Sequence, residues 1–137
     1  MKHVICWVMF FLMSVVSIPG YSAVIGINDD EVKKVAEPIL DNVMKGFTSD
    51  DYLQYSKDFD AALKETITSE RFQEIRGEIV EWIGHYLYRE YLGFINKGAI
   101  TVVFWKGVFD KTEEEVLIKM VVSEKNGQYF IAGLVYQ

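Results

Sequence analysis

The sequence predicts an α+β domain in which helices come first and an antiparallel sheet follows. Between residues 28 and 83, apolar residues recur at helical spacing. From Tyr86 onward, four runs rich in Val, Ile, Phe, Tyr and Trp are separated by short turn signals, as in a β-meander. Helices and strands segregated in this way are typical of the α+β class. A length of 137 residues suits one domain with a single core.

The first 22 residues predict a signal peptide. A basic start precedes an apolar run over residues 4–18, which Pro19 breaks. We expect cleavage after Ser22, with Ala23 as the alternative, and export of residues 23–137 to the periplasm or the extracellular space. The competing interpretation is an uncleaved membrane anchor. It is disfavoured because a spanning helix needs about 20 apolar residues.

The part of the chain after the leader is acidic and has no cysteine. The full chain carries a net charge of −6, and losing Lys2 with the leader makes it one unit more negative. Such a domain is a poor candidate for binding nucleic acid or an anionic membrane surface. Because Cys6 lies in the leader, neither a disulfide nor a thiolate metal site is expected.

The first predicted helix begins after Asn28, whose side chain can cap it. Three acidic residues follow, where the helix dipole favours negative charge. One stripe of helical spacing comprises Val32, Val35, Ala36, Ile39, Val43, Met44 and Phe47. Pro38 removes a backbone donor within this stripe, so we expect either a kink or two short helices. Gly46 is placed for a C-cap.

Two further helical segments follow. A capping pattern over residues 48–51 predicts a short one, whose apolar positions are Tyr52, Tyr55, Phe59 and Leu63. Whether it breaks near residues 57–58 stays open. The next helix starts at residues 66–69, ends at Gly84, and has the stripe Phe72, Ile75, Ile79, Trp82 and Ile83. Gly77 in its middle predicts a close approach by another element, since an interior glycine costs about 1 kcal/mol relative to alanine.

The predicted sheet has strands at residues 86–95, 99–109, 112–123 and 128–137, with a bend at Gly93. Asn126 and Gly127 predict a two-residue type I′ hairpin, because both central residues of that turn need positive φ. This hairpin fixes the register of the last two strands. The facing pairs are Val122 with Ile131, Met120 with Gly133, and Ile118 with Val135, all on one side of the sheet, the first face.

The second face then carries Leu117, Lys119, Val121, Ser123, Phe130, Ala132, Leu134 and Tyr136. The number of loop residues in the turn at Asp110 decides which side chains of the preceding strand lie on each face. An even number of loop residues puts Thr101, Val103 and Trp105 on the first face and Ile100, Val102, Phe104 and Val108 on the second. A three-residue loop exchanges the two sets.

Both faces are largely apolar, which is unusual for an antiparallel sheet with one solvated side. Helices can cover one face, so the other predicts a partner. We expect a homodimer through this outer face, with the interface residues Phe104, Lys119, Phe130, Leu134 and Tyr136. The alternative is strong curvature that makes both faces partly interior.

Aromatic residues could also line a pocket for a small apolar ligand. The candidates are Tyr52, Tyr55, Phe59, Trp82, Trp105 and Met120. Core packing with the tyrosine hydroxyls reaching water explains the same residues. Both interpretations stay open from the sequence.

No pattern in the sequence indicates catalysis or a metal site. Glu74, Glu78, Glu81 and His85 would share one helix face, but that face opposes the apolar stripe and should be solvated. Residues 113–115 are three consecutive glutamates, which on a strand point to alternating sides and cannot converge on a cation. No Gly-x-Ser-x-Gly elbow or phosphate-binding loop appears. We therefore predict no metal and no cofactor.

Several segments together resemble a known superfamily. They are the first helix, Asp51-Tyr52, residues 55–59, the helix ending at residues 82–84, and the meander closing with residues 131–134. Across the exported chain they look like small secreted domains of unknown function with the cystatin-like, or nuclear-transport-factor-like, cone fold. This resemblance implies helices packed into a curved four-stranded antiparallel sheet, often with an apolar pocket and a dimer through the outer side.

The resemblance leaves three functions open. The first is an exported non-catalytic domain that binds a protein partner or a small apolar ligand. The second is a small cone-fold isomerase or dehydratase, since some resembling members are such enzymes, with Asp58 or Glu90 as the base. The third is a structural dimer without a ligand. No residue here matches a catalytic motif of that superfamily, and a shared fold does not transfer function.

Overall fold

We describe residues 24–137 of a computed structural model of the protein. The predicted signal peptide lies outside the described residues. The elements, in order, are α1 (Asp29–Thr48), α2 (Tyr52–Tyr55), α3 (Ala61–Thr66), α4 (Ser69–Trp82), β1 (Tyr86–Lys97), β2 (Ile100–Phe109), β3 (Val116–Lys125) and β4 (Gln128–Tyr136). The strands form one antiparallel sheet in the order β1-β2-β3-β4. The predicted α+β class with a four-stranded meander is confirmed.

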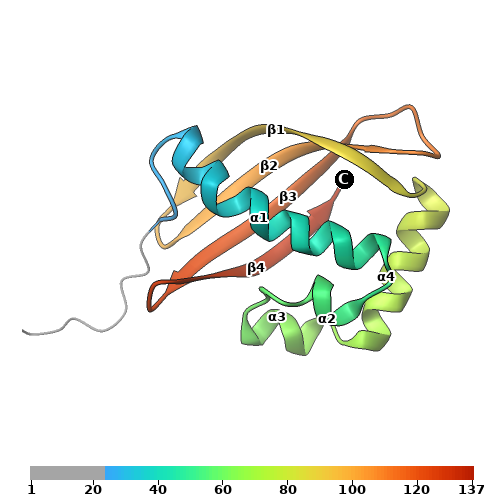
Figure 1. Ribbon diagram of the computed structural model, residues 1–137, viewed down its shortest axis with the longest axis horizontal. Coiled ribbons are helices and arrows are strands. Elements are labelled where there is room, and N and C mark those ends of the chain that lie inside the picture. Colours follow the sequence, from blue (N-terminus) through green and yellow to red (C-terminus); the bar gives the residue numbers. More distant parts are fainter. Residues whose placement is uncertain (1–23) are drawn as a thin grey trace, which may run out of the picture.

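All four described helices lie on one side of this sheet (Figure 1). Helix α1 crosses the sheet, α2 and α4 lie near the C-terminal end of α1, and α3 lies beside β4 (Figure 1). We call the helix-covered side the inner face and the opposite side the outer face. Among the described residues no helix covers the outer face.

Helix α1 is a single continuous helix. The Asn28 side chain accepts a hydrogen bond from the Glu31 backbone N–H at 3.0 Å, so the predicted N-cap is confirmed. Its buried stripe faces the sheet and contains Val32, Ala36, Ile39, Leu40, Val43, Met44 and Phe47. Pro38 lies on the exposed side within the helix, so the prediction of two short helices is wrong. Packing of the stripe on both sides of Pro38 against one sheet outweighs the lost hydrogen bond.

Gly46 is not the C-cap of α1, and that prediction is wrong. The helix continues to Thr48, and Ser49 is its C-cap. A Cβ atom on Gly46 would lie 2.2 Å from the backbone nitrogen of Tyr55. Gly46 therefore lets α2 pack directly on the last turn of α1.

The second predicted segment is divided into α2 and α3, which settles the open question about residues 57–58. Asp51 and Asp60 cap the two helices. Between them the chain runs beside β4: the Ile131 N–H donates to the Asp58 carbonyl at 2.7 Å, and the Asp60 N–H donates to the Ile131 carbonyl at 2.9 Å. This loop covers part of the free edge of β4, which is the last strand of the sheet.

Helix α4 ends as predicted at Gly84, whose φ is +91°. Two other predictions for this helix are wrong. Gly77 is exposed, and a Cβ there would meet nothing within 4 Å. Trp82 is 60% exposed instead of buried with Phe72 and Ile79, whereas the next residue, Ile83, is buried in the core.

The β3–β4 hairpin has the predicted turn but loses the predicted register after four pairs. Asn126 and Gly127 have φ of 54° and 77°, and Val122 faces Ile131. A bulge at Ala132 then inserts one residue, so Met120 faces Leu134 and Ile118 faces Tyr136. Leu134 and Tyr136 therefore point to the inner face and Val135 to the outer face, opposite to the prediction.

The even-loop alternative for the β2–β3 connection is confirmed. Val103 faces Met120 and Trp105 faces Ile118, all buried on the inner face. In β1 the register shifts between Tyr91 and Gly93, where a bend is predicted.

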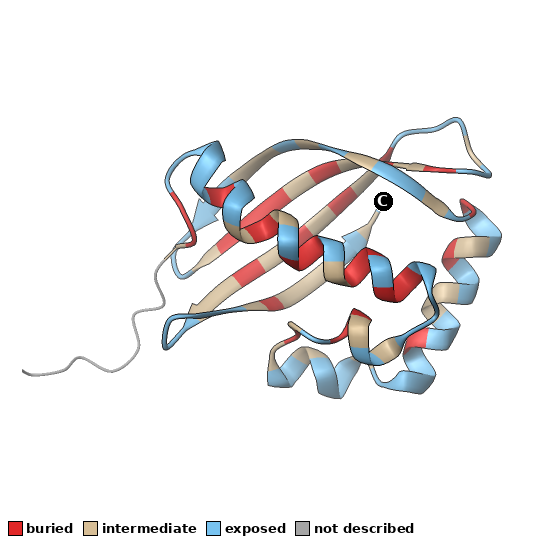
Figure 2. Cartoon of the chain, viewed as in Figure 1, coloured by how far each residue is buried: buried red, intermediate tan, exposed pale blue. Residues whose placement is uncertain are grey.

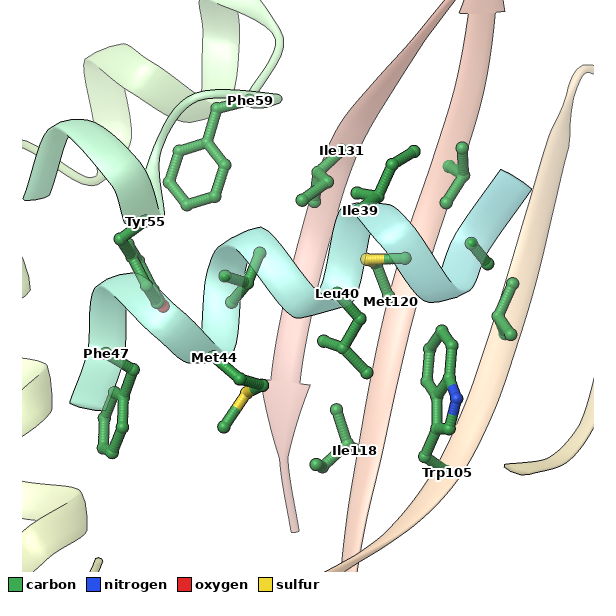
Figure 3. Close-up of a cluster of buried hydrophobic side chains, with 14 of the residues drawn as sticks. Ile39, Leu40, Met44, Phe47, Tyr55, Phe59, Trp105, Ile118, Met120 and Ile131 are labelled. Carbon is green, nitrogen blue, oxygen red and sulfur yellow. The ribbon is translucent and has the colours of Figure 1, made fainter. Parts of the chain in front are cut away.

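The core lies between α1 and the inner face of the sheet (Figure 2). Its largest fully buried side chains come from all parts of the chain, including Trp105, Tyr55, Phe47, Phe59, Phe72, Phe109 and Leu40. Side chains of α1 such as Leu40 and Met44 point toward the strands that carry Trp105, Ile118 and Met120 (Figure 3).

Candidate functional site

The outer face of the sheet is apolar over all four strands. The register places on it Tyr88, Ile95, Ile100, Val102, Phe104, Val108, Leu117, Val121, Phe130 and Val135. Tyr88 is 61%, Ile95 48% and Val135 38% exposed, whereas Val102 is buried and Phe104, Val108, Leu117 and Val121 are half-buried. An exposed apolar patch of this kind usually marks an interaction surface.

Four lysines follow the outer face in register: Lys106 and Lys119 lie within it, and Lys97 and Lys125 lie at strand ends next to the turns. Lys106 Nζ lies 3.2 Å from carboxylate oxygens of both Glu90 and Glu115. Lys119 lies between Phe104 and Val135 in the register and has no ion pair within residues 24–137. Lys119 is therefore a positive charge without an ion pair among apolar side chains.

An open groove of about 850 Å³ lies between α1 and the start of β4. We call it the α1–β4 groove. Along α1 it is lined by Glu31, Lys34, Val35, Pro38 and Ile39, along β4 by Gln128, Tyr129 and Phe130, and elsewhere by Ile25, Lys57 and Asp58. The α1 residues follow the helical period, so the groove runs along one side of that helix.

The charged groups of the α1–β4 groove are unequally satisfied. Glu31 accepts a hydrogen bond from the Ile27 N–H at 2.8 Å, and Asp58 accepts one from the Asn42 side chain at 3.2 Å. Lys34 and Lys57 have no ion pair in the part of the chain that the structure describes. The groove therefore offers two ammonium groups without an ion pair, beside two carboxylates that accept hydrogen bonds from uncharged N–H groups.

A polar network joins α1 to the inner face of β1 and β2. Glu37 accepts hydrogen bonds from Arg89 and, at 2.7 Å, from the indole N–H of Trp105. The guanidinium of Arg89 also donates to Asp41 at 2.8 Å and to the Tyr86 hydroxyl at 3.2 Å. Burial alone would lower the pKa of Arg89, but the hydrogen bonds to these groups outweigh it and raise that pKa. A charge paired on several sides in this way anchors the helix to the sheet.

Three tyrosines are held in the neutral form by their surroundings. Burial raises the pKa of Tyr55 to about 12, and burial raises the pKa of Tyr136 well above its ordinary value. Burial and a hydrogen bond to Asp29 raise the pKa of Tyr91. The Tyr136 hydroxyl also lies 3.8 Å from the sulfur of Met44. None of these groups is therefore poised as a base near neutral pH.

The six residues predicted to line a pocket are dispersed through the molecule. Tyr55, Phe59, Trp105 and Met120 are buried in the core (Figure 3). Tyr52 is half-buried and donates from its hydroxyl to the Ile67 carbonyl at 2.7 Å, while Trp82 is exposed. None of the six lines the α1–β4 groove or the smaller hollow of about 270 Å³ beside Arg89.

The five predicted interface residues divide between the two faces. Phe104 and Lys119 lie on the outer face as predicted. Phe130 also follows the outer side in register, and it lines the α1–β4 groove at the sheet edge. Leu134 and Tyr136 belong to the inner side because of the bulge at Ala132, and the ring of Tyr136 lies 6.3 Å from that of Phe47. These two placements correct the prediction.

The carboxylates predicted as alternative bases lie apart. Asp58 is at the rim of the α1–β4 groove, and Glu90 is on the outer face beside Lys106. His85 is largely exposed, and its Nδ1 lies 3.2 Å from Asp110. Among residues 24–137 no group of three or more His, Cys, Asp or Glu side chains is arranged to hold a metal ion.

Sequence reasoning missed two sets of residues. Arg89 is the one arginine in the predicted sheet, a signal that could have drawn attention to the network with Glu37. Lys34 and Pro38 flank the apolar stripe of the first helix, but no local sequence pattern shows that a groove lies between this side of the helix and β4.

Comparisons with known proteins identify no family. No family model matches the chain, and no curated protein matches it. Among solved structures, the chain is similar to a SEC-C motif containing protein from Rhodopseudomonas palustris, determined in solution. The identity is 12%, the TM-score is 0.49, and the match covers 76% of this chain and 90% of that chain. Within the described residues, no helix has the length and apolarity needed to cross a membrane.

Proposed function

We propose that this chain is an exported, non-catalytic binding domain that pairs with a second copy of itself through the outer face of its sheet. The observation that carries the proposal is the outer face, which is apolar on all four strands and uncovered by any described helix. Covering it removes from water side chains such as Phe104 and Val121, which no element of the described fold can bury. Export is proposed from the leader-like first 22 residues.

The size of the outer face suits a dimer. Its strands have 9 to 12 residues, so the four-stranded face measures roughly 20 Å by 30 Å. A standard interface buries about 800 Å² on each partner. A twofold pairing presents the same patch on both copies, which a single apolar face satisfies.

The charges of the outer face also favour a second copy. Lys119 needs a carboxylate partner, and another copy presents Glu90 and Glu115 on the same surface. Within one copy, Lys106 already contacts both glutamates. In the dimer these glutamates would be shared between Lys106 of their own copy and Lys119 of the other. The proposed interface therefore places Lys119 among apolar side chains, where a carboxylate of the second copy can pair with it.

The experiment measures the mass of the purified protein in solution by sedimentation at 1 to about 100 µM, the range in which weak dimers populate. We expect a dimer that Val121→Glu and Val135→Glu convert to a monomer, because each buries a carboxylate in the interface. Ala62→Glu adds the same charge on exposed α3 and leaves the dimer intact. Circular dichroism confirms that each variant is folded. A monomeric wild-type protein throughout this range contradicts the proposal.

A further inference from the structure

The α1–β4 groove has the dimensions and the lining of a small-molecule site. Its volume of about 850 Å³ falls within the range of about 300–1,000 Å³ that such sites occupy. From Glu31 to Ile39 its helical wall extends roughly 12 Å along the axis of α1, comparable with a medium-chain alkyl group. Ile25, Val35, Pro38, Ile39 and Phe130 make most of this lining apolar.

The groove also has polar groups that no part of the described protein satisfies. The carboxylates of Glu31 and Asp58 accept hydrogen bonds from uncharged N–H groups, whereas the ammonium groups of Lys34 and Lys57 have neither a hydrogen bond nor an ion pair within the described residues. Lys34 comes from α1 and Lys57 from the loop after α2, so the two approach the groove from different elements. An anionic group at this rim gains charge-assisted hydrogen bonds.

Pro38 adds a second feature to the same wall. Because proline has no N–H, it cannot donate the helical hydrogen bond to the carbonyl of Lys34, one turn earlier. Both residues line the groove. Pro38 therefore adds an apolar ring to this wall of the groove.

We propose that the α1–β4 groove binds a small amphipathic carboxylate, whose hydrocarbon chain lies over Val35 and Ile39 and whose carboxylate pairs with Lys34 and Lys57. The apolar floor supplies most of the affinity, since each buried CH₂ contributes about 0.8 kcal/mol. The lysines select for a negative head group. The binding is non-covalent and needs no residue of the outer face other than Phe130, which lies at the shared edge.

The test is calorimetric titration of the purified protein with dodecanoate. Dodecanol, which has the same chain without the charge, and acetate, which has the charge without the chain, are the comparison ligands. We expect saturable one-to-one binding of dodecanoate, at least tenfold tighter than that of either comparison ligand. Amide chemical shifts of Val35, Ile39 and Tyr129 should move on binding, while those of Val121 should not.

Variants locate the head group. The double variant Lys34→Gln with Lys57→Gln should weaken dodecanoate binding at least tenfold and leave dodecanol unchanged. Lys64→Gln is the matched control, because Lys64 is an exposed lysine on α3 that does not line the groove. The proposal is overturned if dodecanoate does not saturate, if dodecanol binds equally well, or if the double variant binds as the wild-type protein does.

Two further measurements distinguish binding in the groove from binding at a lipid surface or at the dimer interface. Vesicles of phosphatidylglycerol test whether the carboxylate is recognised as a free molecule or as part of an anionic surface. Binding to vesicles that survives in the double lysine variant contradicts the groove as the site. Val121→Glu should retain dodecanoate binding, so the failure of the dimer and the failure of this site are distinguishable.

Discussion

Both faces of β3 carry aliphatic side chains, and their surroundings differ. On the inner face Ile118, Met120 and Val122 are fully buried, whereas on the outer face Leu117 and Val121 stay half-buried. The strand alternates between the faces as its pleat requires. The difference comes from α1, which covers one face and not the other (Figure 1). The apolar residues of a sequence thus show which surfaces favour burial. Whether a helix layer covers a given face decides which of these surfaces are buried.

This difference has an energetic meaning. Full burial of a large aliphatic side chain stabilises the fold by about 1.5–3 kcal/mol. The inner side chains already supply that stabilisation to the monomer. The outer ones retain much of it until something covers them, which is why the outer face is the natural surface for association.

The largest expected effect comes from truncating neighbours on opposite faces of β3. Ile118→Ala should lower the free energy of unfolding by about 2–5 kcal/mol, because it leaves a cavity in a fully buried site. Leu117→Ala should cost less than about 1 kcal/mol in the monomer, since its side chain is half-exposed there. Urea titration at low protein concentration measures both values. Equal losses in the two variants would contradict the assignment of inner and outer faces.

A smaller effect distinguishes the glycines of the packed and open sides. Gly46→Ala should destabilise the protein by about 1–3 kcal/mol, because its Cβ would collide with the backbone nitrogen of Tyr55. Gly77→Ala should instead stabilise it by about 0.5–1 kcal/mol, since that helical site is open. Thermal unfolding followed by circular dichroism gives the two signs. A stabilising Gly46→Ala would mean that α2 does not pack on α1 as described.

The smallest expected effect is a loss of stability at alkaline pH that originates in the core. Burial raises the pKa of Tyr55 to about 12 from an ordinary value of 10.0. A side chain whose pKa is raised in the folded state makes its full contribution to the free energy of unfolding below pH 10. This contribution is lost as the pH rises through about 12. The loss should be on the order of 1 kcal/mol at pH 11.

Tyr55→Phe provides the control for this pH effect. Removing the hydroxyl should flatten the decline in stability between pH 10 and pH 12, measured by urea unfolding at each pH. Tyr136→Phe should act in the same direction, because burial also raises the pKa of Tyr136. If stability declines as steeply with pH in both variants as in the wild-type protein, the effect does not originate in Tyr55 and Tyr136.

Features set by a few neighbouring residues were predictable from the sequence. Asn28 caps α1, and Asn126 with Gly127 makes a two-residue turn, because each depends on hydrogen bonds or backbone angles within four residues. The α+β order and the two apolar faces follow from periodicity alone. In the last hairpin, the predicted facing pairs are correct as far as Val122 with Ile131.

Other features depend on contacts between distant segments, and only the tertiary structure decided them. The bulge at Ala132 brings Leu134 and Tyr136 under α1, while the loop at Asp58 pairs with Ile131. Similarly, the exposure of Trp82 and the α1–β4 groove depend on where α4 and β4 end relative to the sheet and to α1. Sequence patterns report local preferences, whereas these placements minimise the free energy of the whole packed chain.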